Sequence, residues 1–355
     1  MKQRIEALRK SLAASSLDAA LITGGVNIRY YSGFTSSDGI LLITQKNTYL
    51  VTDFRYTIQA KAQTKGLCEI VEAGFAEQLG YIRGFLLADG CARAGFEDGE
   101  LTVASFRAYG AMPVAWVPFG DAISLPRLYK SAEEIESLQA AQRIADRSFL
   151  EWLGRIGAGM TELAATAELN YVCAKNGSEG ASFDPIIAGG PNGAMPHAMP
   201  GERCLQKGDL VVADFGCMVN GYHSDMTRTF AVGSIDDDSR QIYEIVKTAQ
   251  QMALDALTNG ISGKALDAVA RDYIAAKGYG AQFGHGLGHG FGLEIHEPPR
   301  ASLSSEDTLT SGMTITVEPG IYVGGKCGVR IEDCCVVTDD GYHNFAGVTK
   351  ELISI

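Results

Sequence analysis

The chain has 355 residues, of which 46% are hydrophobic and 20% charged, a composition typical of a soluble globular protein with two or three domains. Its 30 basic and 42 acidic residues leave a net charge of −12, which argues against nucleic-acid binding because such a surface repels phosphates. No apolar run approaches the roughly 20 residues of a membrane helix, and the start lacks the apolar core of a secretory signal, so we expect neither membrane insertion nor export.

The first third of the chain predicts a small α/β domain. Ile5, Leu8 and Leu12 recur at helical spacing and predict a first helix. Strands are expected where short apolar runs end in glycine or polar residues, at 19–22, 40–43 and 49–51. The run 111–119 contains two prolines and is therefore expected as an edge strand or a connector. This part has no histidine, so we expect no metal chemistry within it.

A domain boundary is predicted near Leu125-Pro126, which divides the chain into residues 1–125 and 126–355. Just beyond it, Ser131 and Glu134 have the spacing of a capping box and predict the start of a long helix. Three further helices, each followed by glycine or Asn-Gly, are predicted at 161–175, 238–259 and 264–277.

Carboxylates interrupt apolar strands in the second domain. The strand expected at 210–219 carries Asp214 and returns, after the hairpin signal Asn220-Gly221, as 222–232. A two-residue turn makes Asp214 and Asp225 diagonal neighbours on one face, with backbones roughly 7–8 Å apart. Two carboxylates that face one buried patch repel each other, so a cation or a proton is expected between them.

The same pattern recurs nearer the C-terminus. Strands expected at 313–318 and 328–337 each carry one carboxylate, Glu318 and Glu332, close to a glycine-containing turn. The intervening segment 283–299 is rich in glycine and holds three of the six histidines of the chain: His285, His289 and His296.

Simpler interpretations exist for parts of this pattern. A single strand carboxylate could equally form a structural salt bridge with Arg228 or Arg330, but four carboxylates beside a histidine cluster are harder to explain in that way. The segment 286–292 lacks the spacing of a nucleotide-binding glycine loop. His223-Ser-Asp225 matches the start of an iron-binding facial triad, although pairing Asp225 with Asp214 accounts for it more economically.

Four carboxylates and one imidazole predict a metal centre. Oxygen-rich ligation with imidazole suits Mn, Co, Fe or Zn, and it differs from a thiolate site. These donors exceed what one catalytic metal needs, whereas two divalent cations about 3.5–4 Å apart would share them and balance four negative charges. The eight cysteines form no Cys-x-x-Cys pair, so we expect reduced, mostly buried thiols and a cytoplasmic protein.

In this order and strand context, Asp214, Asp225, His289, Glu318 and Glu332 resemble the ligand set of the pita-bread-fold metallopeptidases. Within that group the chain looks like the Xaa-Pro peptidases, the prolidases and aminopeptidase P enzymes. The supporting segments are 182–197, 224–230, 288–292, 317–322 and 329–333. Segments 27–34 and 52–56 resemble the creatinase-type N-terminal domain, so the resemblance covers essentially the whole chain.

The resemblance implies a creatinase-like α/β domain followed by an α+β pita-bread catalytic domain. It also implies a role for each ligand: Asp214 chelates one metal, Asp225 and Glu332 bridge both, and His289 and Glu318 bind the second. Glu318 would also accept a proton, and His197 and His296 would contact the substrate and the developing oxyanion. Arg330 is expected to orient Glu332, and His285 to lie behind the metal ligands or to have a structural role. Arg300 is a candidate clamp for the terminal carboxylate of the substrate.

The expected activity is hydrolysis of the Xaa-Pro bond in dipeptides or at the N-terminus of short peptides, with two divalent metal ions, manganese first. Phe183 and Tyr322 are candidate walls for the proline ring, and a homodimer is expected. Two alternatives stay open: a non-catalytic pita-bread module that binds proteins, and a related aminopeptidase without preference for proline. The metal-free amidinohydrolases of this fold lack the carboxylates, methionine aminopeptidases usually lack the first domain, and an iron oxygenase barrel is opposed by the long helices.

Overall fold

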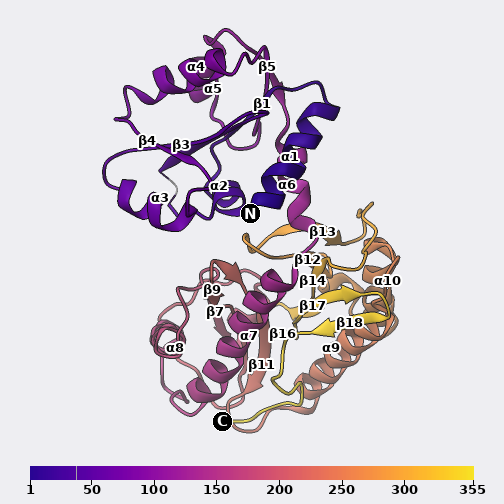
Figure 1. Cartoon of the computed structure of the whole chain (residues 1–355). Coiled ribbons are helices and arrows are strands. Elements are labelled where there is room, and N and C mark those ends of the chain that lie inside the picture. The colour runs from indigo at the N-terminus through magenta and orange to yellow at the C-terminus, as the bar shows by residue number, and fades with distance from the viewer. Residues whose placement is uncertain (37) are drawn as a thin grey trace. The chain divides into compact units, whose positions relative to one another are not determined.

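The computed structural model describes residues 1–36 and 38–355, and the chain divides into two compact units, Met1–Arg127 and Leu128–Ile355. Figure 1 shows both units, with the first in indigo and purple and the second in magenta to yellow. Within the described residues, no helix is long and apolar enough to cross a membrane.

The first unit is built on a six-stranded mixed sheet with the order β4-β3-β2-β1-β5-β6. Its strands are β1 (Ala19–Ile22), β2 (Gly39–Thr44), β3 (Thr48–Thr52), β4 (Glu69–Glu72), β5 (Arg93–Phe96) and β6 (Ala115–Pro118). Its helices are α1 (Lys2–Ala14), α2 (Gly25–Ser32), α3 (Thr57–Thr64), α4 (Gln78–Ala88), α5 (Val103–Gly110), α6 (Gly120–Ser124) and the 3₁₀ turn η1 (Leu125–Leu128). The first helix and the three strands predicted from the sequence are confirmed, and β6 lies at the sheet edge, where Pro118 disrupts no central ladder.

One buried carboxylate organises the loop that follows β1. Glu97 accepts hydrogen bonds from the backbone of Thr23 at 2.6 Å and of Gly24 at 2.8 Å, and from the side chain of Asn27 at 2.7 Å. Burial raises the pKa of Glu97, while these donors lower it. Glu97 therefore anchors the start of α2 within the first unit.

The second unit contains four long helices and a set of short sheets. The helices are α7 (Ala132–Leu153), α8 (Glu162–Lys175), α9 (Asp237–Ala256) and α10 (Gly263–Ala276), with 3₁₀ turns η2 (Gly190–Ala194) and η3 (Gly280–Gln282). The strands are β7 (Ile186–Gly189), β8 (Leu210–Phe215), β9 (Met218–Val219), β10 (Tyr222–His223), β11 (Met226–Ala231), β12 (Gly288–Gly290), β13 (Glu297–Ala301), β14 (Thr314–Val317), β15 (Gly320–Val323), β16 (Cys327–Arg330), β17 (Asp333–Thr338) and β18 (Gly341–Asn344). Two three-stranded sheets, β11-β8-β7 and β14-β17-β18, form its framework.

Each helix pair covers its own set of strands. One apolar cluster joins α7 and α8 to β8 and β11 through Phe149, Leu169 and Phe230, and the other joins α9 and α10 to β14–β17 through residues such as Val246 and Ile315. Figure 1 shows α9 and α10 beside the yellow strands and α7 beside β11. The two halves of the unit thus repeat one plan, helices packed on a sheet.

For three of the four long helices of the second unit, the bounds predicted from local sequence agree with the structure. The predicted capping box is confirmed, because Ser131 accepts the N–H of Glu134 and the Glu134 carboxylate accepts the N–H of Ser131. The predicted end of α9 at residue 259 is wrong, since the helix stops at Ala256. Leu257 turns to an extended conformation there and buries its side chain in the core cluster of α9 and α10.

Lys130 lies just before α7 and is buried inside the second unit. Its ammonium lies 3.2 Å from the carboxylate of Glu297 in β13, and both side chains are almost completely buried. The backbone N–H of Lys130 donates to Gly312 O. This residue therefore fixes the entrance to α7 against the strand that follows His296.

Two hairpins lose their ladder pairing at the carboxylates. The predicted two-residue turn is confirmed, with Val219 opposite Tyr222 and Asp214 opposite Thr227, and pairing is interrupted on both strands between these two ladders. The single strand predicted at 328–337 is wrong, because it divides into β16 and β17.

The division has a physical cause. β17 pairs with β14 and β16 with β15 in one constant register, which leaves Glu318 opposite Glu332 in the gap. Pro319 has no N–H to donate there. The N–H of Glu332 donates instead to Thr227 O, and that of Glu318 to Leu287 O. The two gaps thus present carboxylates where the strands separate.

Candidate metal centre

The predicted residues converge on one cavity of about 390 Å³ in the second unit. The five predicted ligands line it: Asp214, Asp225, His289, Glu318 and Glu332. It is also lined by Phe183 and by the predicted contact residues His197, His285, His296, Arg300 and Arg330. His223, the other candidate iron ligand, lies in β10 and is absent from the lining in the part of the chain that the structure describes. The facial-triad alternative therefore lacks its first histidine.

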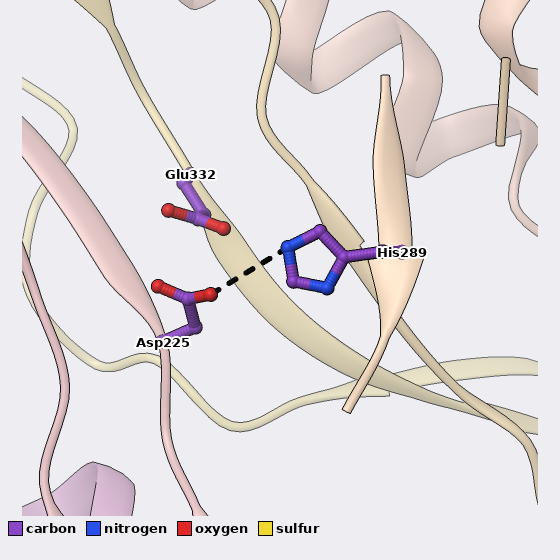
Figure 2. Close-up of side chains that lie close together, drawn as sticks. All are labelled: Asp225, His289 and Glu332. Carbon is purple, nitrogen blue, oxygen red and sulfur yellow. Dashed lines mark ion pairs between the residues drawn. The ribbon is translucent and has the colours of Figure 1, made fainter. Parts of the chain in front are cut away.

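Asp225, His289 and Glu332 form the tightest group of donors. One donor atom from each lies within 4.8 Å of the others, and all three residues are buried. Figure 2 shows the three side chains pointing toward one another from separate elements. His289 Nε2 lies 3.7 Å from Asp225 Oδ2 and 3.3 Å from Glu318 Oε1. This geometry gathers a mixed oxygen and nitrogen donor set around one point.

The donors have lone pairs that no protein group uses. Asp214 Oδ1 and Glu332 Oε1 are buried without a hydrogen-bond partner among the described residues. His289 Nδ1 lies 3.1 Å from Gly290 O, and donation of its proton to that carbonyl leaves a lone pair on Nε2, which faces the carboxylates. Buried acceptors of this kind are costly unless a cation binds them. The residues present therefore fit divalent metal ions.

Electrostatics in the cavity also favour a cation. Burial, followed by repulsion from Asp214 and Glu318, raises the pKa of Asp225 well above its usual value. Burial and the charge of Asp225 likewise raise the pKa of Glu332. Burial opposes ionisation of Glu318 too, but without a metal ion a hydrogen bond from His289 and its charge prevail and lower the pKa of Glu318 to about 2, an interaction that metal binding through Nε2 would replace. The cluster must therefore hold protons or metal ions to offset its negative charge.

Arg330 contacts a different carboxylate from the one predicted. Its guanidinium donates to Asp214 Oδ2 at 2.5 Å and, through Nε, to Thr227 Oγ1 at 3.1 Å. Thr227 in turn donates to Glu332 Oε2 at 2.7 Å. The strand breaks between Arg330 and Glu332, and Thr227 links the guanidinium to the Glu332 carboxylate, so the orientation of Glu332 by Arg330 stays a prediction. Thr227 was not predicted, and its spacing of two residues from Asp225 was the only available signal.

His285 and Tyr322 form a hydrogen-bonded extension of this network. His285 Nε2 lies 2.9 Å from the Tyr322 hydroxyl, and its Nδ1 lies 2.7 Å from Gly286 O. The Tyr322 hydroxyl accepts a hydrogen bond from Arg330 at 2.7 Å. Burial lowers the pKa of His285. With both ring nitrogens engaged, His285 supports its neighbours, and the Tyr322 hydroxyl is directed at Arg330 and His285.

Three exposed residues line the cavity beside the buried cluster: His197, His296 and Arg300. The ring of His296 lies 4.4 Å from that of His289, with the planes at 70°. Burial, followed by the charge of His289, lowers the pKa of His296, which favours a neutral imidazole near neutral pH. A group bound at the buried cluster would therefore meet imidazoles on its outer side.

Comparison with known proteins gives consistent matches along the chain. The sequence pattern of metallopeptidase family M24 matches residues 136–339, and that of the creatinase/prolidase N-terminal domain matches residues 4–128. A relative described as an Xaa-Pro dipeptidase from Pyrococcus furiosus is 37% identical over 99% of this chain and 100% of its own.

Solved structures agree with these matches. The Xaa-Pro dipeptidase from Bacillus anthracis superimposes with a TM-score of 0.95 at 40% identity and covers 99% of both chains. The X-Pro aminopeptidase from Thermotoga maritima superimposes with a TM-score of 0.90 at 36% identity, covering 96% of this chain and 98% of its own.

Proposed function

The chain belongs to metallopeptidase family M24, and from this membership and the donors of the cavity we propose that it hydrolyses Xaa-Pro peptide bonds, in dipeptides and at the N-terminus of short peptides. Its first unit is a creatinase-type α/β domain and its second an α+β pita-bread domain. The observation that carries the proposal is the convergence of four carboxylates and His289 on one cavity, where two buried carboxylate oxygens have no hydrogen-bond partner among residues 1–36 and 38–355.

We propose that these residues hold two divalent cations, with manganese the first to test and cobalt, zinc and iron the alternatives. Asp214 would bind one ion, Asp225 and Glu332 would lie between the two, and His289 and Glu318 would bind the other. When bound, such ions polarise a carbonyl group and acidify a water molecule. The oxygen-rich donor set, in which every cavity carboxylate is wholly or largely buried, supports this assignment.

The protein's own groups then have distinct tasks. Glu318, which lines the cavity 3.3 Å from His289, would accept the proton of the attacking water. His197 and His296 line the outer part of the cavity, where an imidazole N–H could donate to the carbonyl oxygen as its charge develops. Arg330 would keep Asp214 oriented through its guanidinium.

The proline preference follows from substrate chemistry. An Xaa-Pro bond is a tertiary amide without an N–H, so recognition of this bond cannot depend on a donor there. The cavity provides an apolar wall in Phe183 for the ring. Arg300, exposed on β13, would bind the carboxylate of a dipeptide and so favour dipeptides over longer chains.

Assembly and location complete the proposal. We propose a homodimer, because the first unit contributes none of the predicted ligands and its role is then that of a wall or an interface. Eight free cysteines, seven of them buried, are compatible with a reducing cytoplasm.

The test is activity after controlled metal loading. Protein stripped with a chelator is reloaded with Mn²⁺, Co²⁺, Zn²⁺ or Fe²⁺, and hydrolysis of Ala-Pro, Ala-Pro-Ala and Ala-Ala is measured beside the metal content. We expect about two ions per chain, as in two-metal hydrolytic sites, and cleavage of the proline peptides only after loading. Equal cleavage of Ala-Ala would contradict the proline preference, and activity without metal would contradict the metal assignment.

A further inference from the structure

A single buried carboxylate outside the cavity controls the segment that carries His197. We infer that Glu162 is a positioning residue that closes the His197 loop (residues 189–201) and thereby sets the place of His197. The inference rests on the proposed function for its catalytic consequence, whereas the anchoring itself can be tested without any substrate.

Glu162 is the first residue of α8, and its side chain is fully buried. Its Oε1 accepts the N–H of Gly189 at 2.9 Å, where the loop begins, and its Oε2 accepts the N–H of Gly201 at 3.2 Å, where the loop ends. The side-chain amide of Asn192 donates to both oxygens at 3.0 and 3.1 Å. One carboxylate therefore joins the two ends of the loop and its 3₁₀ turn.

The backbone of α8 adds to this attachment. The N–H of Glu162 donates to Arg203 O, and the N–H of Leu163 donates to Gly201 O. These contacts bring the end of the loop to the first turn of α8. The Glu162 carboxylate and the first turn of α8 thus both hold the Gly201 end of the loop.

The middle of the loop is held from the cavity side. Arg330 donates to the carbonyl of Pro196, the neighbour of His197, at 3.2 Å. A side chain at Gly328 would collide with Gly193 O, so the loop lies directly on the backbone of β16. The β7–β8 ladder holds Gly189 and the backbone of α8 holds Gly201, and the Glu162 carboxylate is the side chain that joins these two ends to each other.

The substitution Glu162→Gln removes the negative charge of the side chain and keeps its size. A glutamine side chain has one acceptor oxygen in place of two, and its NH₂ group would face the Asn192 amide together with either Gly189 N–H or Gly201 N–H. At least one donor then loses its charged acceptor, and an unsatisfied buried donor favours opening of the loop. The loop should open at one end while α8 and the metal ligands stay in place.

The decisive experiment is a double-mutant cycle on kcat/KM for Ala-Pro with Glu162→Gln and His197→Ala. We expect Glu162→Gln alone to lower kcat/KM by about 10–100-fold, the range seen when outer-shell partners are removed, with metal content unchanged. In the His197→Ala background the same change should cost less than about twofold, since residues that act through each other are not additive. An equal loss in both backgrounds would overturn the role of Glu162 in positioning His197.

The matched control is Glu97→Gln, which removes an equally central loop anchor in the first unit and should leave kcat/KM within about twofold of wild type. If Glu162→Gln does not fold, Asn192→Ala enters the same cycle, because it removes one partner of the carboxylate from a half-buried position.

Hydrogen exchange provides the readout that needs no activity. Amides of residues 189–201 should exchange faster in Glu162→Gln than in wild type, while amides of α8 stay protected. Unchanged exchange in the loop would refute the anchoring whether or not Ala-Pro is hydrolysed. Wild-type protein that fails to cleave Ala-Pro would instead refute the proposed function and leave the exchange result to decide on Glu162.

Discussion

Asp225→Asn is expected to make the metal-free protein more stable while abolishing turnover. Asp225 is 4% exposed, and burial together with Asp214 and Glu318 raises its pKa well above 3.8. A group whose pKa is higher in the folded state binds more protons there than in the unfolded state. Its stabilising contribution is complete below the unfolded pKa and is lost as the pH rises, so the metal-free protein should lose stability above about pH 4.

The size of the effect follows from proton linkage. Each such proton changes the free energy of unfolding by about 1.4 kcal/mol per pH unit. At pH 6, about two units above the usual pKa of an aspartate, a group that stays protonated in the folded protein contributes roughly 3 kcal/mol. The asparagine variant avoids this loss and also removes the charge that raises the pKa of Glu332. The difference between the variants should be near zero at pH 4 and grow to about 3 kcal/mol at pH 6.

Urea denaturation in the presence of a chelator at pH 4, 5, 6 and 7 measures this difference. Titrating groups outside the cluster cancel between the variants, and exposed Asp340→Asn serves as the control. Addition of Mn²⁺ should reverse the order, because the wild type binds the ion and is stabilised by mass action. A difference that stays constant across this pH range would refute the reasoning, as would turnover by the variant with two metals bound.

Further predictions concern other parts of the site. His289→Ala should lose bound metal, whereas His197→Ala should keep it and lose most turnover; plasma mass spectrometry and kcat on both variants decide this. Arg300→Ala should lower kcat/KM for Ala-Pro by roughly 10-fold or more, as expected for loss of a charge-assisted hydrogen bond. It should change kcat/KM little for peptides of three to five residues. A uniform effect on peptides of all lengths would exclude a carboxylate clamp. Gly288→Ala should destabilise the fold by about 1–3 kcal/mol in urea denaturation, because its Cβ would lie 1.9 Å from a carbonyl oxygen of β14. Gly284→Ala, which meets no atom within 4 Å, should not.

Signals that act within one element were predictable from the sequence. The capping box at Ser131 and the hairpin at Asn220-Gly221 are set by contacts between residues three positions apart or fewer, and both are confirmed. The common face of Asp214 and Asp225 could be anticipated from period-two alternation, whereas the convergence of all five predicted ligands on one cavity was implied by the resemblance to the pita-bread-fold metallopeptidases.

Features that depend on distant residues were not predictable in this way. The break between β16 and β17 arises where Glu332 bonds to Thr227, which lies 105 residues away in sequence. The partner of Arg330 is Asp214, 116 residues away, and no local pattern distinguishes it from Glu332. The anchor Glu162 looks in sequence like an ordinary acidic residue in a first helical turn. In each case the partner is determined by a contact between residues that lie far apart in the sequence.

The buried pair of Lys130 and Glu297 bears on where the chain can be divided experimentally. A catalytic fragment that started after Lys130 would keep Glu297 inside the protein and remove the ammonium that lies 3.2 Å from it, and removal of one partner of a buried ion pair typically costs about 3–5 kcal/mol. Because Glu297 follows His296 directly, the damage would appear as a weakened enzyme as well as a less stable one. Limited proteolysis or domain exchange should therefore cut before Leu128, so that the short linker stays with the unit it serves.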